Sequence, residues 1–437
     1  MSKRPSTKES TTPQKKIKRD SKVHYTGWEV PRADGTLEKV DIKDLTPEGF
    51  YAKYVKTRRP VVIKGFVQDA SFLAPTKWTN AYLKKTAGSE KLMVEERTST
   101  ADSFGQGNEV PMTFAAFLDL LDKRDALHYL TTQDVKADAE TGRPQLMAPF
   151  VQALAGDFPV SPALMGHLIP QNINIWMGLS TDGSTTGLHH DYHDNLYILL
   201  RGKKRFRLYS PGDVEAMYTR GALLKVHPNG RINYEGEETT AYGADLKAEQ
   251  AVSAFTAQQR AEKELEDAEL DLANGVAGAA DRVAAAEEAL EMAMDEAMDA
   301  EFDEEEDAGD DDDEDGGDDD EDNDEEFDYD PSSELLVDKT VKFPTNFSRV
   351  KTDRPAAEIT ADFPRFHDAK AVFADVQVGE MLYLPASWFH EVVSYGNEGH
   401  LALNYWYHPP DAADNFANPY TSDFWSNDFA ARGDAAN

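Results

Sequence analysis

The chain has 437 residues, 40% of them hydrophobic, so it can bury a substantial core. It contains no cysteine, which excludes a disulfide framework and a cysteine-ligated zinc and fits a reducing intracellular compartment. The formal net charge of −36 disfavours a nucleic-acid substrate. No apolar stretch approaches the length of a membrane span and the first residues lack a signal-peptide core, so we expect a soluble intracellular protein.

Residues 1–22 form a basic tail rich in Ser, Thr and Pro, a composition that cannot bury a core. Lys3 and Arg4 are followed by a ten-residue spacer and by a second basic cluster at 15–19. This spacing is typical of a bipartite nuclear localisation signal. It predicts a nuclear import receptor as a partner and the nucleus as the location, with the cytoplasm as a second location. A solubilising or nucleic-acid-attracting tail is the alternative.

The next segments predict helices and strands that support a larger sheet. Residues 41–56 are typical of a helix entered near Pro47, and 61–64 (V-V-I-K) of an extended strand. Residues 113–123 are amphipathic and predict a second helix. Polar and apolar residues alternate over 172–177, which predicts a strand beside the motif described next.

Three polar side chains in two distant segments indicate a metal site: His189 and Asp191 in the motif L-H-x-D, and His390 after an apolar run. Residues at i and i+2 of a strand face the same side, so His189 and Asp191 can hold one ion while His190 points elsewhere. The apolar run predicts a buried strand, with Pro385 kinking it just before His390. Two His and one carboxylate suit Fe(II) with open coordination positions. For each His alone, a satisfied core residue is the alternative.

A basic cluster lies downstream of this motif. The apolar strand 196–200 leads to Gly202, and the cations around it are Arg201, Lys203, Lys204, Arg205 and Arg207. A cation one strand away from a metal can neutralise a carboxylated co-substrate. Spacing alone does not choose between Lys203 and Lys204.

Together these motifs resemble the JmjC-domain 2-oxoglutarate oxygenases. The likeness covers most of residues 40–235 and 340–410 and is nearest to the small hydroxylase branch, in particular to the lysyl hydroxylases that modify GTP-binding proteins. The segments that carry it are L-H-x-D at 188–191, N-L-Y at 195–197, G-K-K-R-F-R-L-Y-S-P at 202–211, L-Y-L-P-x-x-W-x-H at 382–390, L-N-Y-W-Y at 403–407, R-P-V-V-I-K-G at 59–65 and P-M-T-F-A-A-F-L-D-L-L at 111–121.

The resemblance implies a mainly β fold, a double-stranded β-helix of the cupin or jelly-roll type with N-terminal α/β elements. Family members often dimerise through C-terminal helices, so a homodimer is one expectation, although this tail is short and polar. The expected parts are the basic tail 1–22, the α/β support 23–160, the first half of the jelly roll 161–235, an insertion 236–335, the second half 336–410 and the C-terminal tail 411–437.

Carried over by position, the resemblance implies that His189, Asp191 and His390 bind Fe(II). Lys204 then pairs with the distal carboxylate of 2-oxoglutarate, and Thr186 supplies a hydroxyl that assists Lys204. The choice of Lys204 over its neighbour rests on the resemblance. With dioxygen as the second co-substrate, this set describes a dioxygenase.

Four further residues occupy positions that the family uses near the metal and the co-substrate. Tyr129 corresponds to a tyrosine that donates to the same carboxylate as Lys204. Asn195 and Asn404 correspond to amides near the metal and the co-substrate, and Trp406 to an aromatic wall. Ordinary core packing with a bonded polar tip is the alternative for Tyr129 and Trp406.

The insertion 236–335 has two compositions. Residues 247–300 are rich in Ala, Glu, Gln and Leu and predict one or two exposed helices. Residues 301–330 hold 22 acidic residues and no Lys or Arg, so without them the formal charge changes from −36 to −14 (−36 + 22). Such a run repels itself, and we expect it to be disordered. It is either a tether for basic partners or a solubilising loop.

The function that these expectations favour is hydroxylation of a protein side chain, with lysine as the favoured target and a GTP-binding or basic protein as the partner. Decarboxylation of 2-oxoglutarate to succinate and carbon dioxide would supply the oxidant. The same chemistry on N-methyl-lysine would make a demethylase that releases formaldehyde. A catalytically silent nuclear binding protein on a cupin scaffold is an alternative from another class, and hydroxylation of an RNA base is a further one.

Overall fold

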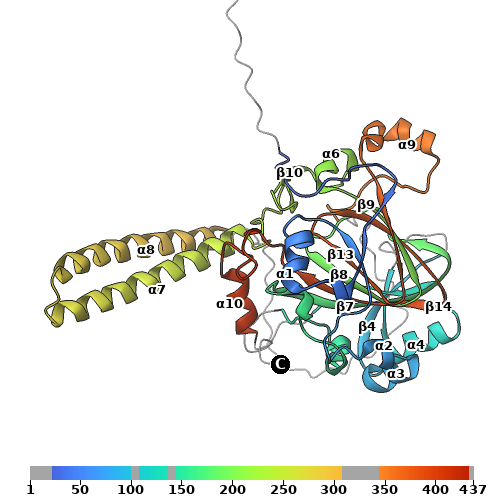
Figure 1. Ribbon diagram of the computed structural model, residues 1–437, viewed down its shortest axis with the longest axis horizontal. Helices are drawn as coiled ribbons and strands as arrows, with labels where there is room; N and C mark the ends of the chain where they lie inside the picture. Colours follow the sequence, from blue (N-terminus) through green and yellow to red (C-terminus); the bar gives the residue numbers. More distant parts are fainter. Residues whose placement is uncertain (1–21, 100–107, 136–143, 308–343, 433–437) are drawn as a thin grey trace, which may run out of the picture.

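The computed structural model describes residues 22–99, 108–135, 144–307 and 344–432. Strands dominate one body, short helices cover part of it, and a long helical hairpin projects to one side (Figure 1). None of the described helices is long and apolar enough to cross a membrane.

The strands in the described ranges are, in chain order, β1 (Gly35–Thr36), β2 (Lys39–Asp41), β3 (Val61–Lys64), β4 (Lys91–Glu96), β5 (Asn108–Thr113), β6 (His128–Leu130), β7 (Pro170–Thr185), β8 (Asp194–Arg201), β9 (Lys203–Tyr209), β10 (Leu223–Val226), β11 (Ile232–Tyr234), β12 (Val372–Gln377), β13 (Glu380–Leu384) and β14 (Phe389–Tyr407). The α-helices are α1 (Pro47–Phe50), α2 (Ala74–Lys77), α3 (Asn80–Ala87), α4 (Phe114–Asp122), α5 (Pro149–Gln152), α6 (Val214–Met217), α7 (Leu246–Ala273), α8 (Ala279–Asp307), α9 (Ala356–Asp362) and α10 (Phe424–Ala431).

A 12-stranded sheet folds over on itself to form the body. One path through it has the order β2-β3-β13-β8-β14-β7-β6-β4-β5, and a second runs from β1 through β12 and β9 to β14. Strand β14 belongs to both paths, because its first part pairs with β9 and its last part with β8. The two paths thus face each other across the interior. This arrangement confirms the expected cupin-type jelly roll.

Alternating side chains of the central strands fill two cores. In β8, Leu196 and Ile198 pack toward the helices that cover the sheet, whereas Tyr197 and Leu199 point between the two facing sheets. The inner core also contains Phe206 and Leu208 of β9 and apolar residues of β12, β13 and β14. Polar residues on these inward positions are therefore enclosed, and they are the candidates for a site.

Residues 41–56 form shorter elements than the single predicted helix. Asp41 ends β2, and its carboxylate accepts from the Lys43 N–H at the start of a 3₁₀ turn. Helix α1 begins only at Pro47, after the Thr46 hydroxyl caps the Gly49 N–H, and a π-helical turn continues it to residue 55. The prediction started the helix too early because proline suits the first helical position and not the interior.

The predicted strand 61–64 and the predicted helix 113–123 agree with the structure. The predicted strand 172–177 is also present, but it pairs with other segments than expected. Strand β3 spans 61–64, and α4 begins after Thr113, whose hydroxyl accepts from the Ala116 N–H. Residues 172–177 lie in β7, but β7 pairs with β14 and β6 and not with the segment that carries His189. The reason is that β7 runs directly into that segment, so the segment continues the strand and cannot flank it.

The segment 247–300, for which the sequence predicts one or two helices, lies within α7 and α8, which project from the body (Figure 1). Helix α8 ends at Asp307, so the first residues of the acidic run 301–330 are helical where disorder was predicted. Residues 308–330 and the basic tail up to residue 21 lie outside the described residues.

The C-terminal segment closes against the base of the hairpin. The Ser422 hydroxyl donates to the Glu249 carboxylate at 2.8 Å, and the Trp425 indole N–H donates to the Tyr242 carbonyl at 2.9 Å. Helix α10 therefore lies beside the start of α7, as Figure 1 shows. Dimerisation through this tail stays a prediction.

Candidate metal centre

The two segments with the predicted metal ligands face each other as a single antiparallel bridge. The His189 N–H donates to the His390 carbonyl at 3.0 Å, and the His390 N–H donates to the His189 carbonyl at 2.6 Å. The two imidazole rings lie 4.3 Å apart between centroids. The bridge thus brings together residues that are 201 positions apart in the chain.

Both local environments differ from the predicted strands. His189 and Asp191 lie in the connection between β7 and β8, where only His189 forms a bridge. The apolar run before His390 is two strands, because β13 ends at Leu384 and a turn with Pro385 and a positive φ of 59° at Ser387 separates it from β14. His390 is therefore the second residue of a new strand. The turn is what redirects its side chain toward the motif L-H-x-D.

His189, Asp191 and His390 each offer a ligand atom, and these atoms lie within 4.8 Å of one another. The His390 Nε2 and the Asp191 Oδ2 are 3.6 Å apart. Donors bound at about 2.1 Å to one ion stand about 3–4 Å from each other, so the set fits a single metal. Two imidazoles and one carboxylate on one side of an ion form the set that non-haem Fe(II) oxygenases use.

Backbone carbonyls fix both imidazoles. The His189 Nδ1 lies 3.1 Å from the Gly187 carbonyl, and the His390 Nδ1 lies 2.9 Å from the Trp388 carbonyl. A ring nitrogen that donates to a carbonyl carries the hydrogen, which leaves the Nε2 lone pair for a metal. In both cases the acceptor is two residues before the histidine. The motifs in the sequence do not identify these two carbonyls as supporting groups.

Burial, together with the nearby His390, lowers the pKa of His189 to about 4. The imidazole is therefore neutral at pH 7 and available as a ligand. His190 points away, as predicted: its Nε2 bonds the Tyr234 hydroxyl at 2.8 Å, and its side chain is buried. Burial lowers the pKa of His190 to about 3. It serves the core and offers no atom to the metal.

A buried ion pair ties the two ligand-bearing segments together. Arg58 forms a bidentate pair with Asp194, and its Nη1 lies 2.8 Å from the Asp194 Oδ2. Asp194 also accepts from the Tyr383 hydroxyl at 2.6 Å and from the Ala386 N–H at 2.9 Å. Asp194 follows Asp191 by three residues, and Ala386 precedes His390 by four. The pair therefore holds the turn before His390 against the L-H-x-D connection.

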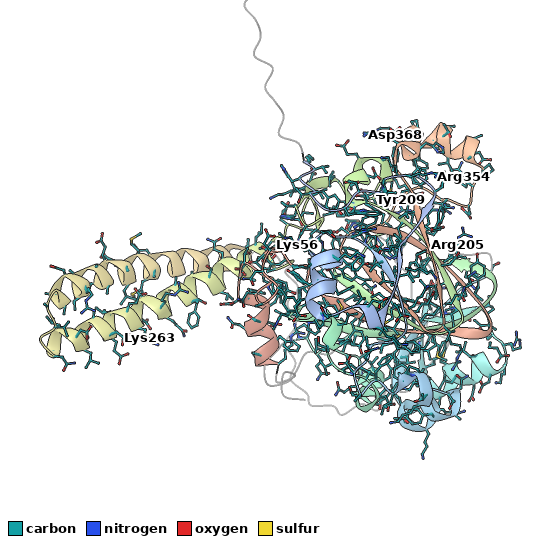
Figure 2. All side chains as sticks on the ribbon, in the orientation of Figure 1. Lys56, Arg205, Tyr209, Lys263, Arg354 and Asp368 are labelled. Atoms are coloured by element: carbon teal, nitrogen blue, oxygen red, sulfur yellow. The ribbon has the colours of Figure 1, made fainter. Side chains whose placement is uncertain are left out.

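Lys204 is the member of the basic cluster that enters the interior. Its side chain is 1% exposed and shares the inward face of β9 with Phe206. Lys203 and Arg205 are about half exposed and lie 3.9 and 4.0 Å from Asp375. Figure 2 labels Arg205 at the edge of the body. Burial and strand alternation thus distinguish Lys204 from Lys203, which the spacing in the sequence did not.

Lys204 has no ion-pair partner among the described residues. Its Nζ donates to the Ser394 hydroxyl at 2.5 Å and lies 5.7 Å from the centre of the Tyr129 ring. Burial lowers its pKa to about 7. A buried cation without a counter-charge is costly, and an anionic ligand would offset that cost.

Of the two residues expected to assist Lys204, Tyr129 lies beside the cation, whereas the Thr186 hydroxyl bonds to backbone groups. Tyr129 is buried beside Lys204, and burial raises the pKa of its phenol above the usual range. The Thr186 hydroxyl donates to the Gly187 carbonyl and accepts from the Val392 N–H, each at 3.2 Å. The hydroxyl in contact with Lys204 is that of Ser394. The sequence reasoning missed Ser394, although it lies at i+4 from His390 on the same strand and interrupts an apolar pattern.

His400 is a second residue that the sequence reasoning missed. It is fully buried, its ring lies 5.5 Å from that of Tyr129, and both of its ring nitrogens lack a hydrogen-bond partner among the described residues. Burial and the nearby charge of Lys204 hold its pKa well below the usual range. Unsatisfied polar atoms around a buried ammonium are what a cavity for a carboxylated ligand leaves behind.

The two predicted amides form one hydrogen-bonded chain. The Asn404 Nδ2 donates to the Asn195 Oδ1 at 3.3 Å, and the Trp176 indole N–H donates to the Asn404 Oδ1 at 2.7 Å. Trp406 meets Trp176 edge to face at 6.3 Å between ring centres. Both tryptophans are half-buried, and Trp176 packs against the inner core.

A cupin fold with a two-His, one-carboxylate set and a buried cation defines a class of metal-dependent oxygenase. Residues 47–413 match the model of the cupin-like domain family. The chain is 31% identical to "JmjC domain-containing protein 4" of Schizosaccharomyces pombe, over 91% of this chain and 89% of that protein. The chain belongs to the cupin-like JmjC-domain family, whose members are typically Fe(II)- and 2-oxoglutarate-dependent oxygenases.

More distant relatives carry names for two reactions. The human "Bifunctional peptidase and (3S)-lysyl hydroxylase JMJD7" is 28% identical over 39% of this chain and 54% of its own length. "Lysine-specific demethylase 8" of Danio rerio is 22% identical over 48% of this chain and 50% of its own length. The relatives therefore include a hydroxylase and a demethylase by name.

Proposed function

We propose that this protein is an Fe(II)- and 2-oxoglutarate-dependent dioxygenase that hydroxylates a side chain of another protein, with lysine as the favoured target. The observation that carries the proposal is the combination of three convergent ligand atoms with the unpaired, buried Lys204 on a neighbouring strand. A metal alone would not need that cation. A dianionic co-substrate bound beside the metal would.

When bound, Fe(II) with 2-oxoglutarate supplies an oxidant for a C–H bond by decarboxylating the co-substrate. The residues of this chain position that chemistry. His189, Asp191 and His390 would hold the metal, and the carbonyls behind the two histidines keep their Nε2 atoms directed at it. Lys204 would bind the distal carboxylate, whose negative charge favours the protonated ammonium and offsets the cost of burying it.

The groups around Lys204 would orient the same carboxylate. The Ser394 hydroxyl already accepts a hydrogen bond from Lys204 and can donate its own hydrogen to an anion. His400 has a ring N–H without a partner, and Tyr129 lies next to both. Apolar side chains of the inner core, such as Phe206 and Leu208, exclude water from the end of the site.

The choice of protein hydroxylation over demethylation follows from the hydroxylase-branch motifs together with the relative named as a lysyl hydroxylase. A demethylase would use the same site on an N-methyl-lysine. The two outcomes separate in one assay, because only demethylation releases formaldehyde from a methylated peptide. We further propose a nuclear location through the basic clusters at residues 3–4 and 15–19.

The first test is an anaerobic titration of the full chain with Fe(II) and 2-oxoglutarate, followed by the weak visible charge-transfer absorption of the chelated metal. We expect absorption only when both are added, and its loss in His189→Ala. Lys204→Ala should still bind the metal but should need at least tenfold more 2-oxoglutarate. Native protein that binds iron and shows no such absorption would refute the oxygenase assignment.

A further inference from the structure

The α7–α8 hairpin has the packing of a short antiparallel coiled coil. Fully enclosed residues recur every seven positions, and all of them are alanine: Ala254, Ala261 and Ala268 in α7, and Ala279, Ala286 and Ala293 in α8. A strict period of seven indicates two helices packed along one seam, and small residues let them approach closely. Leu265, Val283 and Leu290 are half-buried at the positions between.

The same repeat divides the exposed surface of the hairpin into two sides. In an antiparallel pair, residues that flank the seam at equivalent positions meet on the same side. The ion pair between Arg282 and Asp271, at 2.8 Å, marks one side. The residue that follows each enclosed alanine lies on the other side.

We name that other side the acidic face. The residues directly after the seam alanines lie on this side. Val252 also lies there, because it is one helical turn before Phe255. The acidic face consists of Val252, Phe255, Glu262, Glu269, Ala280, Glu287 and Met294.

The acidic face combines exposed apolar surface with one sign of charge. Phe255 is 58% exposed, Met294 49% and Val252 39%. No Lys or Arg occupies the flanking positions of this side in the described helices, whereas Arg260 and Arg282 lie on the opposite side. Phe255, Met294 and Val252 share this side with three glutamates, and exposed apolar residues bordered by charge are typical of a contact surface.

The base of the hairpin lies beside the residue that follows the L-H-x-D motif. Asp245, Leu246 and Lys247 line a cavity of about 460 Å³ together with Tyr192 and Glu237. Tyr192 directly follows the metal ligand Asp191, and its hydroxyl lies 3.1 Å from the Glu237 carboxylate. A chain bound along the hairpin therefore has its near end close to the connection that carries His189 and Asp191.

We propose that the acidic face is a docking surface for a lysine- and arginine-rich amphipathic segment of the protein substrate. That the docked protein is the substrate rests on the proposed function. The docking itself does not need catalysis. A basic helix with one apolar side would pair its cations with the glutamates and cover Phe255 and Met294. The acidic hairpin of a second copy, a nucleic acid or an anionic membrane would meet repulsion from the same glutamates.

The test is fluorescence anisotropy of a labelled peptide of about 20 residues with Leu at helical spacing i, i+3, i+4, i+7 and Lys elsewhere, added to the full chain. We expect binding that weakens with salt. A peptide with Glu in place of Lys should not bind, and one with Ser in place of Leu should bind about tenfold more weakly.

Matched variants separate the acidic face from the acidity of the whole chain. Phe255→Ser with Met294→Ser should lower the affinity about tenfold, whereas Leu270→Ser with Met292→Ser, at 61% and 62% exposure on other sides of the hairpin, should leave it within about twofold. Glu262→Gln with Glu269→Gln should weaken binding more than Glu264→Gln with Asp267→Asn, which removes equal charge elsewhere on α7.

Equal effects of a test pair and its control pair would overturn the proposal, because they would show attraction to bulk negative charge. Circular dichroism of each variant checks that the helices remain. His189→Ala should dock the peptide as the native chain does. Failure of the oxygenase assignment would appear in the iron titration alone, and failure of docking would appear in the anisotropy alone.

Discussion

Lys204 illustrates how one side chain can connect burial to co-substrate binding. Its ammonium is enclosed by the inner core and touches a hydroxyl and an aromatic ring but no carboxylate among the described residues. Burial disfavours the charged form and brings the pKa to about 7. An anion that binds here favours the charged form again, so binding and protonation are linked.

From this linkage we predict that the affinity for 2-oxoglutarate depends on pH in one direction. Below about pH 7 Lys204 is already charged and the affinity is level. As the pH rises above about 7, binding must take up a proton, so the affinity falls by up to about tenfold per pH unit. Calorimetric titrations from about one pH unit below to about two units above the pKa, in buffers of different ionisation enthalpy, measure both effects.

Lys204→Arg is the matched control for that experiment, because a guanidinium keeps its charge throughout this range. Its affinity should be weaker at every pH but should show no step near pH 7. If the affinity of the native protein for 2-oxoglutarate stayed constant from about one pH unit below to about two units above this pKa, the role of Lys204 would be contradicted.

The ion pair of Arg58 with Asp194 acts on stability as well as on the metal. Arg58 is 2% exposed and Asp194 is fully buried. Removal of one partner leaves the other charge enclosed without compensation. We predict that Arg58→Met lowers the free energy of unfolding by about 3–5 kcal/mol, measured by urea denaturation. Arg59→Met, at the half-exposed neighbour, should change it by less than about 1 kcal/mol.

The double variant Arg58→Met with Asp194→Leu distinguishes stability from positioning. It removes both charges, so we expect much of the lost stability to return. Iron affinity should stay reduced, because Asp194 no longer holds the Ala386 N–H. Full recovery of iron binding in the double variant would show that the pair does not position the ligands.

At the scale of elements, the alanine seam sets the distance between α7 and α8. Ala261 lies in its middle and is 6% exposed. We predict that Ala261→Leu forces the helices apart and costs about 1–3 kcal/mol locally. Hydrogen exchange followed by mass spectrometry should show faster exchange in residues 246–307 only. Ala285→Leu, on an exposed position of α8, is the control and should leave exchange unchanged.

A second element-scale feature is the turn that starts β14. The Ser387 N–H donates to the Asp191 carbonyl at 2.7 Å, and the Ser387 hydroxyl accepts from the Ile232 N–H at 3.1 Å. One residue in a left-handed conformation thus contacts both the L-H-x-D connection and β11. Pro385 predicted a kink in the apolar run, but nothing in the run indicated that Ser387 adopts a left-handed conformation and divides it into two strands.

At the scale of the whole molecule, the insertion leaves and re-enters the body at neighbouring points. The Thr345 hydroxyl donates to the Glu237 carboxylate at 2.8 Å, and Tyr192 contacts both residues. The jelly roll pairs its strands without any residue of α7 or α8. The hairpin is therefore an addition to the rim of the site and not part of its scaffold.

We predict that replacement of residues 246–343 by a flexible linker of about eight Gly and Ser residues leaves the body folded. The melting temperature should change by no more than about 4 °C, and the iron and 2-oxoglutarate titration should be unchanged. Peptide docking should be lost. Loss of the cooperative transition on heating would show that the body depends on the hairpin.

By itself the sequence determined the parts of the site that a local rule can reach. The spacing of His189 and Asp191 permits one shared ion, and the ligand types select the metal class. The apolar run before His390 indicated the third ligand, the family motifs added Lys204, and the alanine and glutamate content of 247–300 predicted helices. These inferences depend on residue type and on neighbours a few positions away.

Only the tertiary structure decided the features that join distant segments. The bridge between His189 and His390, the contact of Ser394 with Lys204, and the unsatisfied ring of His400 each require strands far apart in the chain to be adjacent. Their physical reason is strand pairing and burial, which bring together residues that no short-range pattern connects. The side of the hairpin on which Phe255 and its glutamates lie also follows from packing of one helix on another.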